Sequence, residues 1–235
     1  MIGIIGALSV EIEGLLEKME IGDIHTIGGL VYYTGEIAGK NVVLARCGVG
    51  KVNAAMCAQA MKLGFSVSAV INLGAAGAID NALNIGDVVV ATDLVHHDVN
   101  AGSFGYKPGQ LPGMDVLAFS ADKRLSELAV RACNAAFEQG GIPCTVHHGR
   151  IATGDQFIED AATKQHILEE FGALCVEMEG AAIAQVCHQN KTPFVAIRAI
   201  SDKADGSAQA NFDEFVTQAA ENSARSVMEM IGHIL

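Results

Sequence analysis

The sequence predicts an α/β fold, a three-layer sandwich in which a central mixed β-sheet is flanked by helices. Strand-like apolar segments alternate with helix-like segments along almost the whole chain, and this order is typical of the class. Of the 235 residues, 50% are hydrophobic and 18% are charged, which is enough apolar material for a large core. No linker, repeat or low-complexity tract interrupts the pattern. We therefore expect one domain over residues 1–235.

The first part of the chain is expected to form a strand, a helix, a hairpin and a second helix. Residues 2–6 are a short apolar run, which predicts a buried strand, and apolar spacing predicts a helix from Ser9 to Met19. Val31–Ile37 and Asn41–Cys47 are expected to pair as a hairpin across a glycine-containing turn. Lys51–Leu63 then has the apolar spacing of a helix.

The middle of the chain is expected to supply two strands, a long loop and a helix. Strand Val67–Leu73 is predicted to end in the turn Gly74-Ala75-Ala76-Gly77, and strand Asp87–Val95 follows. His96–Leu117 is weakly patterned, and a loop of this length in a compact domain usually has a function. Ala121–Gln139 has the pattern of an amphipathic helix that stops at two glycines.

The last part of the chain is expected to add three strands and the closing helix. The strands are Thr145–Ala152, Cys175–Met178 and Phe194–Ile200, with helices between them. Asn211–Ile234 is predicted to be a long helix with Asn211 as its N-cap. Ligands of such folds bind at the carboxyl ends of the strands, so the chemistry should be sought there.

Charge and hydropathy exclude several classes of function. The chain has 27 acidic and 15 basic residues, a net charge of −12, and lacks the basic stripe of a nucleic-acid-binding protein. No apolar run reaches the ~18 residues of a membrane span. The apolar N-terminus is short and lacks a basic region, so it is interpreted as a strand and not as a signal peptide. We expect a cytoplasmic protein that binds neither nucleic acid nor membrane.

The six cysteines are expected to be buried free thiols. They form no Cys-x-x-Cys pair and mostly lie in apolar runs, which favours a reducing compartment over disulfides. None has a neighbour that would activate it as a nucleophile. The pairs His96-His97 and His147-His148 are adjacent and would point to opposite faces of a strand. We therefore expect no metal site and no cofactor.

Carboxylates gather at the predicted strand ends. Glu11 and Glu13 follow the first strand, Glu177 and Glu179 lie at the end of another, and Asp202 lies just past the last. Acidic residues are also common in the first turn of a helix and as helix caps. For each of these carboxylates this structural role is an open alternative to a role in a site. Several carboxylates without a metal suit proton transfer on a sugar-like substrate. The glycine-rich segments match neither the dinucleotide-binding fingerprint nor the P-loop.

Seven segments in order resemble the bacterial 5′-methylthioadenosine/S-adenosylhomocysteine nucleosidases, a family of the nucleoside phosphorylase superfamily. The resemblance covers essentially the whole chain. The segments are GIIGALSVEIEGL at 3–15, GVGKVNAA at 48–55, INLGAAGAI at 71–79, HHDVNAGSFGYKPGQLPG at 96–113, TGDQFI at 153–158, VEMEGAAIAQVCH at 176–188 and AIRAISDKAD at 196–205.

The resemblance implies hydrolysis of the N-glycosidic bond of 5′-methylthioadenosine and S-adenosylhomocysteine, with adenine as the leaving group, in methionine salvage. 5′-Deoxyadenosine and aminodeoxyfutalosine are further candidate substrates. By resemblance, Asp202 is the general acid that protonates purine N7. Glu11 is the base that activates water, and Glu179 accepts hydrogen bonds from the ribose hydroxyls.

The resemblance also implies the other residues that contact the nucleoside. Phe157 would stack on adenine, the Ile158 backbone would read its edge, and Met178 would lie beside the ribose. Gly77 would approach through its backbone, with Arg198 and Ser201 as support. The remaining substrate-binding residues are expected around an apolar 5′ pocket, with Phe104 and Pro112 from a partner subunit of a homodimer: Ala7, Leu8, Val49, Phe212, Phe104, Tyr106 and Pro112.

Two positions depart from the family pattern, and small effects on the 5′ pocket are expected from both. Ala75 stands where some relatives have serine, and Asn100 stands where aspartate is common. Glu177 has no assigned role; pairing with Arg198 and ordering of the turn are both open.

Two alternative functions remain. The first is a phosphate-dependent purine nucleoside phosphorylase, which would need cationic groups for phosphate. Phosphorylases of this fold have an arginine entering the glycine-rich segment, where this chain has Asn72, and Arg46 alone is a weak substitute. The second is a nucleoside-binding protein without catalysis, but Glu11, Glu179 and Asp202 are all present.

Overall fold

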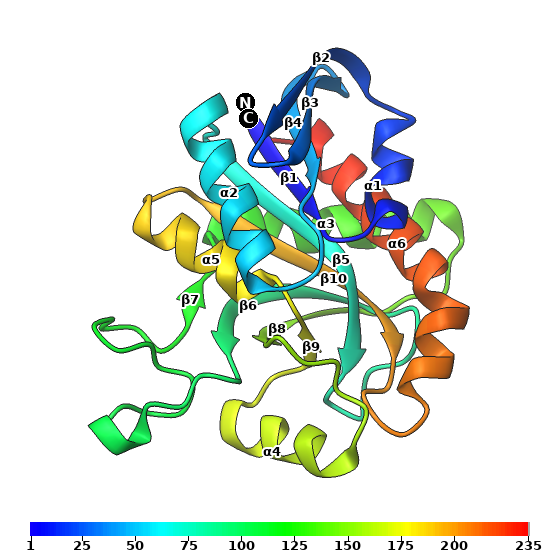
Figure 1. The fold of residues 1–235 in the computed structure, drawn as a ribbon. Coiled ribbons are helices and arrows are strands. Elements are labelled where there is room, and N and C mark those ends of the chain that lie inside the picture. Colours follow the sequence, from blue (N-terminus) through cyan, green and yellow to red (C-terminus); the bar gives the residue numbers. More distant parts are fainter. Residues whose placement is uncertain (235) are drawn as a thin grey trace.

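The computed structural model describes residues 1–234 and has one mixed β-sheet at its centre (Figure 1). β1 (Ile2–Gly6) lies between β4 (Lys40–Arg46) and β5 (Ala69–Ala78), and all three run parallel. β3 (Leu30–Ile37) and β2 (Glu20–Ile27) extend this side antiparallel, so β2 forms the edge.

The other side of the sheet closes on itself through a circuit of strand pairings. β5 pairs with β10 (Phe194–Asp202), which pairs with β6 (Val88–His96). β6 pairs with β8 (Val146–Thr153), and β8 pairs with β9 (Cys175–Glu177), which returns to β5. A short strand, β7 (Phe119–Ser120), pairs with β6. The mixed sheet is as predicted, but this closure was not foreseen.

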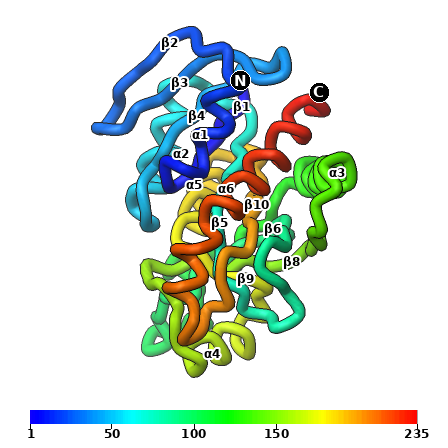
Figure 2. The backbone as a smooth tube through the Cα atoms, turned by 90° about the vertical axis from the view of Figure 1, so that its right-hand side faces the viewer, coloured from blue at the N-terminus to red at the C-terminus, as the bar shows by residue number. Residues whose placement is uncertain are grey.

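Helices cover both faces of the sheet, as predicted (Figure 2). One layer consists of α1 (Ser9–Leu16), α3 (Lys123–Gly140) and α6 (Ala208–Gly232), which pack on one another and on the strands. The opposite layer consists of α2 (Lys51–Phe65) and α5 (Gly180–Gln189). α4 (Ala161–Phe171) follows β8, and a 3₁₀ turn (Gly102–Phe104) lies in the long loop.

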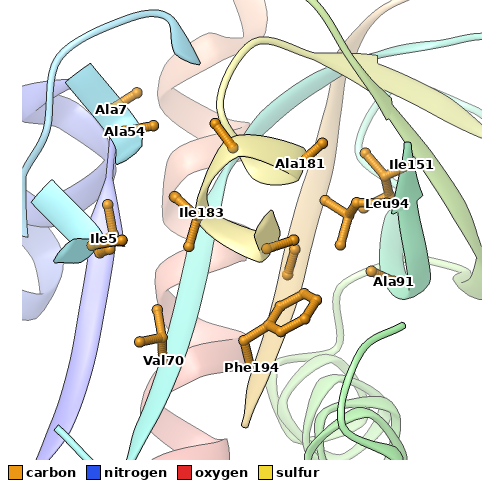
Figure 3. Packing of buried hydrophobic residues seen from close by; sticks show 14 of the residues in the cluster. Ile5, Ala7, Ala54, Val70, Ala91, Leu94, Ile151, Ala181, Ile183 and Phe194 are labelled. Carbon is orange, nitrogen blue, oxygen red and sulfur yellow. The ribbon is translucent and has the colours of Figure 1, made fainter. Parts of the chain in front are cut away.

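Each helical layer has its own apolar core against the sheet. Figure 3 shows the one under α2 and α5, where Ala54 of α2 and Ile183 of α5 lie near Ile5 and Val70 of the strands. A second core lies under α1, α3 and α6. Together they remove both faces of the central strands from water, and all nine residues of β10 are buried. This burial fixes the positions of the strand ends at which the polar groups emerge.

Several predicted boundaries are wrong. The Gly74-Ala75-Ala76-Gly77 segment is part of β5 and not a turn, because it pairs in parallel with β10 from Arg198 onward. The first helix ends at Leu16, since the chain turns there to begin β2, a strand that was not predicted. The last helix begins at Ala208. Asn211 lies inside it and donates to the Ser207 hydroxyl, so Asn211 is not its N-cap.

Among residues 1–234, no helix has the length and apolar character needed to cross a bilayer.

Candidate active site

A cavity of about 290 Å³ opens where β1, β5, β9 and β10 end and the N-terminus of α6 begins. It brings together residues that lie far apart in the sequence. Predicted site residues among its lining are Ala7, Leu8, Glu11, Val49, Gly77, Phe157, Ile158, Met178, Glu179, Ser201, Asp202 and Phe212. The carboxyl ends of the strands therefore supply the site, as expected from the fold class.

Glu11 reaches the cavity from the first turn of α1, and three backbone N–H groups hold its carboxylate. Oε2 accepts from Ala7 at 2.6 Å and from Leu8 at 2.9 Å, while Oε1 accepts from Ala75 at 3.0 Å. The side chain is buried, and burial raises its pKa, although the N–H donors and the charge of Arg198 oppose the rise. The result is a fixed carboxylate with an increased affinity for a proton.

Glu179 lies between β9 and α5, directly before the first residue of the helix. Its Oε1 accepts a hydrogen bond of 2.7 Å from the backbone N–H of Gly50. Burial and the neighbouring Glu177 raise the pKa of Glu179 to about 8, and the Gly50 N–H and Arg198 act in the opposite direction. Among residues 1–234 no group donates a hydrogen bond to the other carboxylate oxygen. Glu179 lines the cavity, so the hydroxyl groups of a ligand could donate to it there.

Asp202 is the last residue of β10, next to an irregularity in the pairing of β10 with β5. The register between β10 and β5 shifts between Ile200 and Asp202, and this bulge lets two consecutive residues, Ser201 and Asp202, line one cavity. Asp202 accepts from the Ala204 N–H at 2.8 Å and from the Ser201 hydroxyl at 2.9 Å. Burial raises the pKa of Asp202 despite these two donors. The protonated form is therefore favoured more than in water.

Glu177, which is part of the cavity lining, forms an ion pair with Arg198, which is not, and each side chain is only 2% exposed. Arg198 also donates to the Asn72 side chain at 2.6 Å. Glu177 accepts from the Thr153 hydroxyl and from the N–H of Gly180 at 2.8 Å. Glu177 therefore pairs with Arg198 and also orders the turn into α5, so both open readings describe it.

Part of the cavity wall is apolar. Leu8 and Val49 line it with Phe157 and Phe212, whose rings meet edge to face with centroids 5.8 Å apart. Phe157 is 40% exposed, which leaves its ring accessible to a stacking partner. An aromatic ring beside apolar side chains fits a planar base together with an apolar substituent.

Four predicted site residues do not line the cavity. Arg198 lies behind it, paired with Glu177. Phe104, Tyr106 and Pro112 lie in the long loop outside the cavity of their own chain; Phe104 is 82% exposed, and the Tyr106 hydroxyl accepts from the Gly113 N–H at 3.3 Å.

The cavity also includes residues that sequence reasoning did not select. Gln156, Val176 and Gln209 line it. Gln156 and Val176 are sequence neighbours of predicted site residues at strand ends, and the fold class alone would have been enough to select them. Gln209 lies on α6 one turn before Phe212, a relationship that the misplaced start of the last helix concealed. Within residues 1–234, no group of His, Cys, Asp and Glu side chains has a metal-binding arrangement.

The family model described as the phosphorylase superfamily matches residues 1–232. The chain belongs to the phosphorylase superfamily. A curated member of this superfamily, the 5′-methylthioadenosine/S-adenosylhomocysteine nucleosidase of Bacillus subtilis (strain 168), is 42% identical over 234 residues, covering 99% of both chains. The resemblance found in the sequence is thus confirmed.

Solved structures of the superfamily have the same fold. The nucleosidase of that name from Neisseria meningitidis, in complex with methylthio-immucillin-A, has a TM-score of 0.93 at 43% identity, covering 99% of each chain. The futalosine hydrolase of Helicobacter pylori strain 26695 has a TM-score of 0.91 at 33% identity, covering 99% of this chain and 97% of its own.

Proposed function

We propose that this protein hydrolyses the N-glycosidic bond of 5′-methylthioadenosine and S-adenosylhomocysteine, releasing adenine and the 5′-substituted ribose. The observation that carries the proposal is the convergence of Glu11, Glu179 and Asp202 on one cavity with an apolar wall. The names of relatives over 40% identical across nearly the whole chain support it. In this proposal the enzyme acts in methionine salvage, and residues 1–235 form a single domain.

Asp202 acts as the general acid in this proposal. An adenine anion leaves poorly, so a proton must reach purine N7 as the bond between C1′ and N9 breaks. The raised pKa of Asp202 favours the protonated form that can give this proton. Ser201 lies 2.9 Å from Asp202 and 3.4 Å from the Ala76 carbonyl. Its hydroxyl can therefore accept from the protonated acid while donating to the carbonyl.

Glu11 acts as the base that takes a proton from the attacking water. The oxygen of that water forms the new bond to C1′ as the bond to N9 breaks. The three N–H donors hold the carboxylate in place before the reaction, and burial makes it a stronger base than in water. Each proton has a named destination: Asp202 gives one to adenine, and Glu11 receives one from water.

Glu179 accepts hydrogen bonds from the ribose hydroxyls, with Met178 beside the sugar. Hydrogen bonds from the ribose hydroxyls favour the ionised form of Glu179, and this carboxylate then stabilises the positive charge that develops on the ribose as the bond breaks. Phe157 stacks on adenine, the Ile158 backbone contacts the edge of the base, and Gly77 lets the ligand approach the backbone.

The apolar wall holds the 5′ substituent. Ala7, Leu8, Val49 and Phe212 suit a thioether, which needs few polar partners. Methylthioadenosine and adenosylhomocysteine share adenine, ribose and sulfur, and differ only beyond that atom. 5′-Deoxyadenosine and aminodeoxyfutalosine remain candidate substrates, and the fold shared with a futalosine hydrolase supports testing them. Parallel measurement of kcat/KM on all four compounds ranks them.

A homodimer completes the 5′ pocket in this proposal. Phe104 is 82% exposed, and α2 presents Val52 and Leu63 at 73% and 75% exposure. Such apolar exposure is typical of a surface that another protein covers. A second copy would bring Phe104, Tyr106 and Pro112 to the mouth of the cavity. A dimer in analytical ultracentrifugation, and a higher KM for Phe104→Ala, are the expected results; a monomer with full activity would contradict the dimer.

A reducing, cytoplasmic location belongs to the same proposal. It is supported by six free cysteine thiols, five of them buried.

The deciding experiment is turnover of methylthioadenosine in buffer free of phosphate. Release of adenine together with free methylthioribose is the expected result. Strict dependence on phosphate, with a sugar 1-phosphate as product, would make the protein a phosphorylase instead. The structure supports hydrolysis because the charge of buried Arg198 is already paired with Glu177, which leaves it poorly placed to bind phosphate.

A further inference from the structure

Three charged residues outside the cavity form a closed network next to it. Lys51 Nζ lies 2.6 and 2.7 Å from the two carboxylate oxygens of Asp98. Asp98 Oδ2 also accepts from the backbone N–H of Asp155 at 2.9 Å, and Asp155 Oδ1 accepts from the backbone N–H of Lys51 at 2.8 Å. Each of the three residues is thus bonded to the other two.

Strand pairing explains why these residues meet although they are distant in sequence. β6 and β8 are parallel and end side by side, with His96 opposite Thr153. Asp98 and Asp155 each lie two residues beyond these ends, so they emerge next to each other. Lys51 is the first residue of α2, whose N-terminus points at the same place.

The network is shielded enough from water to hold its geometry. The side chains of Lys51 and Asp98 are 20% and 13% exposed. Burial disfavours the charge on Asp98, yet the hydrogen bonds from Lys51 and from the Asp155 N–H outweigh it and hold the pKa of Asp98 below its usual range. A largely shielded ion pair with additional hydrogen bonds is better ordered than a surface pair.

The network is directly connected to two proposed substrate contacts. The first backbone N–H groups of a helix have no partner inside it. At α2 the Gly50 N–H donates to Glu179, and the next N–H, that of Lys51, donates to Asp155. Asp155 in turn lies two residues before Phe157. The contact at Gly50 is tight, because a Cβ there would lie 3.2 Å from Asp155 Oδ1.

We propose that Lys51 and Asp98 are positioning residues for nucleoside binding, holding the Gly50 N–H against Glu179 and the Asp155–Phe157 segment against the adenine site. The inference rests on the proposed function. Without the lysine charge, Asp98 and Asp155 would be adjacent carboxylates with no cation, and their repulsion would separate the two segments. Neither residue lines the cavity, so both act through Glu179 and Phe157.

The test measures binding apart from chemistry. The probe is a 7-deaza analogue of methylthioadenosine, whose base lacks the nitrogen that is protonated, and calorimetry gives its Kd. For Lys51→Met and Asp98→Ala the Kd is expected to rise about tenfold to a hundredfold, since small displacements of binding groups cost this much. Lys51→Arg keeps the charge and is expected to restore Kd to within about threefold of the unmodified protein.

A matched control separates positioning from general stability. Arg150 and Asp93 form another partly buried ion pair, at 2.6 and 2.9 Å, away from the cavity. Arg150→Met and Asp93→Ala are expected to leave Kd within about twofold, and their Tm values are measured beside those of the network variants. Asp155 is 48% exposed, so Asp155→Ala tests the same network where the other variants do not fold.

The outcomes are distinct. A Kd for Lys51→Met and Asp98→Ala, or for Asp155→Ala in their place, within about twofold of the unmodified protein would overturn the inference. An equal rise in the Arg150 and Asp93 variants would overturn it too, because the effect would then follow stability alone. Failure of the unmodified protein to bind the probe or to release adenine would instead contradict the proposed function.

Discussion

Arg198 of β10 and Glu177 of β9 form a buried ion pair at the wall of the cavity, with both side chains 2% exposed. Removing one partner leaves the other charged and shielded from water. Arg198→Met is therefore expected to lower the free energy of unfolding by about 3–5 kcal/mol, measured by urea denaturation. The double variant Arg198→Met/Glu177→Gln should lose less than the two single variants together, because neither charge is then left alone.

The partly exposed pair of Arg150 and Asp93 is the control for this prediction. Its side chains are 31% and 23% exposed, so Arg150→Met is expected to cost about 0–1 kcal/mol. Equal losses at both pairs would show that burial does not determine the contribution of Glu177 and Arg198.

Asp202→Asn is expected to remove the proton donor while keeping the shape of the side chain. The kcat for methylthioadenosine should fall by about a hundredfold to ten-thousandfold, with KM changed much less, since the acid is needed in the transition state. Asp205→Asn is a matched control: Asp205 lies three residues further on and outside the cavity lining. Turnover by Asp202→Asn equal to that of the control would exclude the acid role.

Glu179 should make stability depend on pH. Its pKa is raised from 4.5 to about 8, so the native state keeps a proton that the unfolded chain releases between these values. The stabilisation is fully present below the unfolded pKa and is lost as pH rises through the folded pKa. Glu179→Gln should therefore show a flatter fall of Tm between about pH 5 and pH 8 than the unmodified protein. Parallel curves for the two proteins would contradict the raised pKa.

A substitution at Gly77 tests how closely the backbone must approach the Asp202 carboxyl group. A Cβ at this position would lie 2.7 Å from Asp202 Oδ1 and 3.1 Å from the Ala204 side chain. Gly77→Ala is expected to displace the carboxyl group, lowering kcat/KM by about tenfold or more and stability by about 1–3 kcal/mol. Gly206→Ala, where a Cβ would meet nothing within 4 Å, should leave both unchanged. Equal activity of the two variants would show that the site adapts.

The fold class could be predicted because apolar periodicity and burial agree over most of the chain. The missed strand β2 shows where that agreement fails. All its residues are exposed, and a bulge between Ile21 and Asp23 breaks the alternation that identifies a strand. Its apolar residues Ile21, Ile24 and Ile27 then recur every third position, which is not a strand pattern. The Gly74–Gly77 segment has the small residues typical of turns, but its glycines make room for carboxylates: a Cβ at Gly74 would lie 2.7 Å from Glu11 Oε1, and one at Gly77 would lie 2.7 Å from Asp202 Oδ1.

The carboxylates of the site could be located from their positions after apolar strands, and their roles followed only from resemblance. The bulge at Ser201, which turns two consecutive side chains into one cavity, has no local signal. The contacts among Lys51, Asp98 and Asp155 span 47 to 104 positions and depend on the parallel pairing of β6 and β8. A single sequence does not give the register in which its strands pair, so these contacts could not be predicted from it.

The position of β10 has a consequence for how the protein opens to solvent. This strand is bonded on both edges, is buried throughout, and carries Arg198, Ser201 and Asp202. Its amide hydrogens should exchange with deuterium only when the whole molecule unfolds, whereas those of the exposed edge strand β2 should exchange through local fraying. The proposed general acid is thus anchored in the strand expected to exchange most slowly, and local fraying at the periphery should leave its position unchanged.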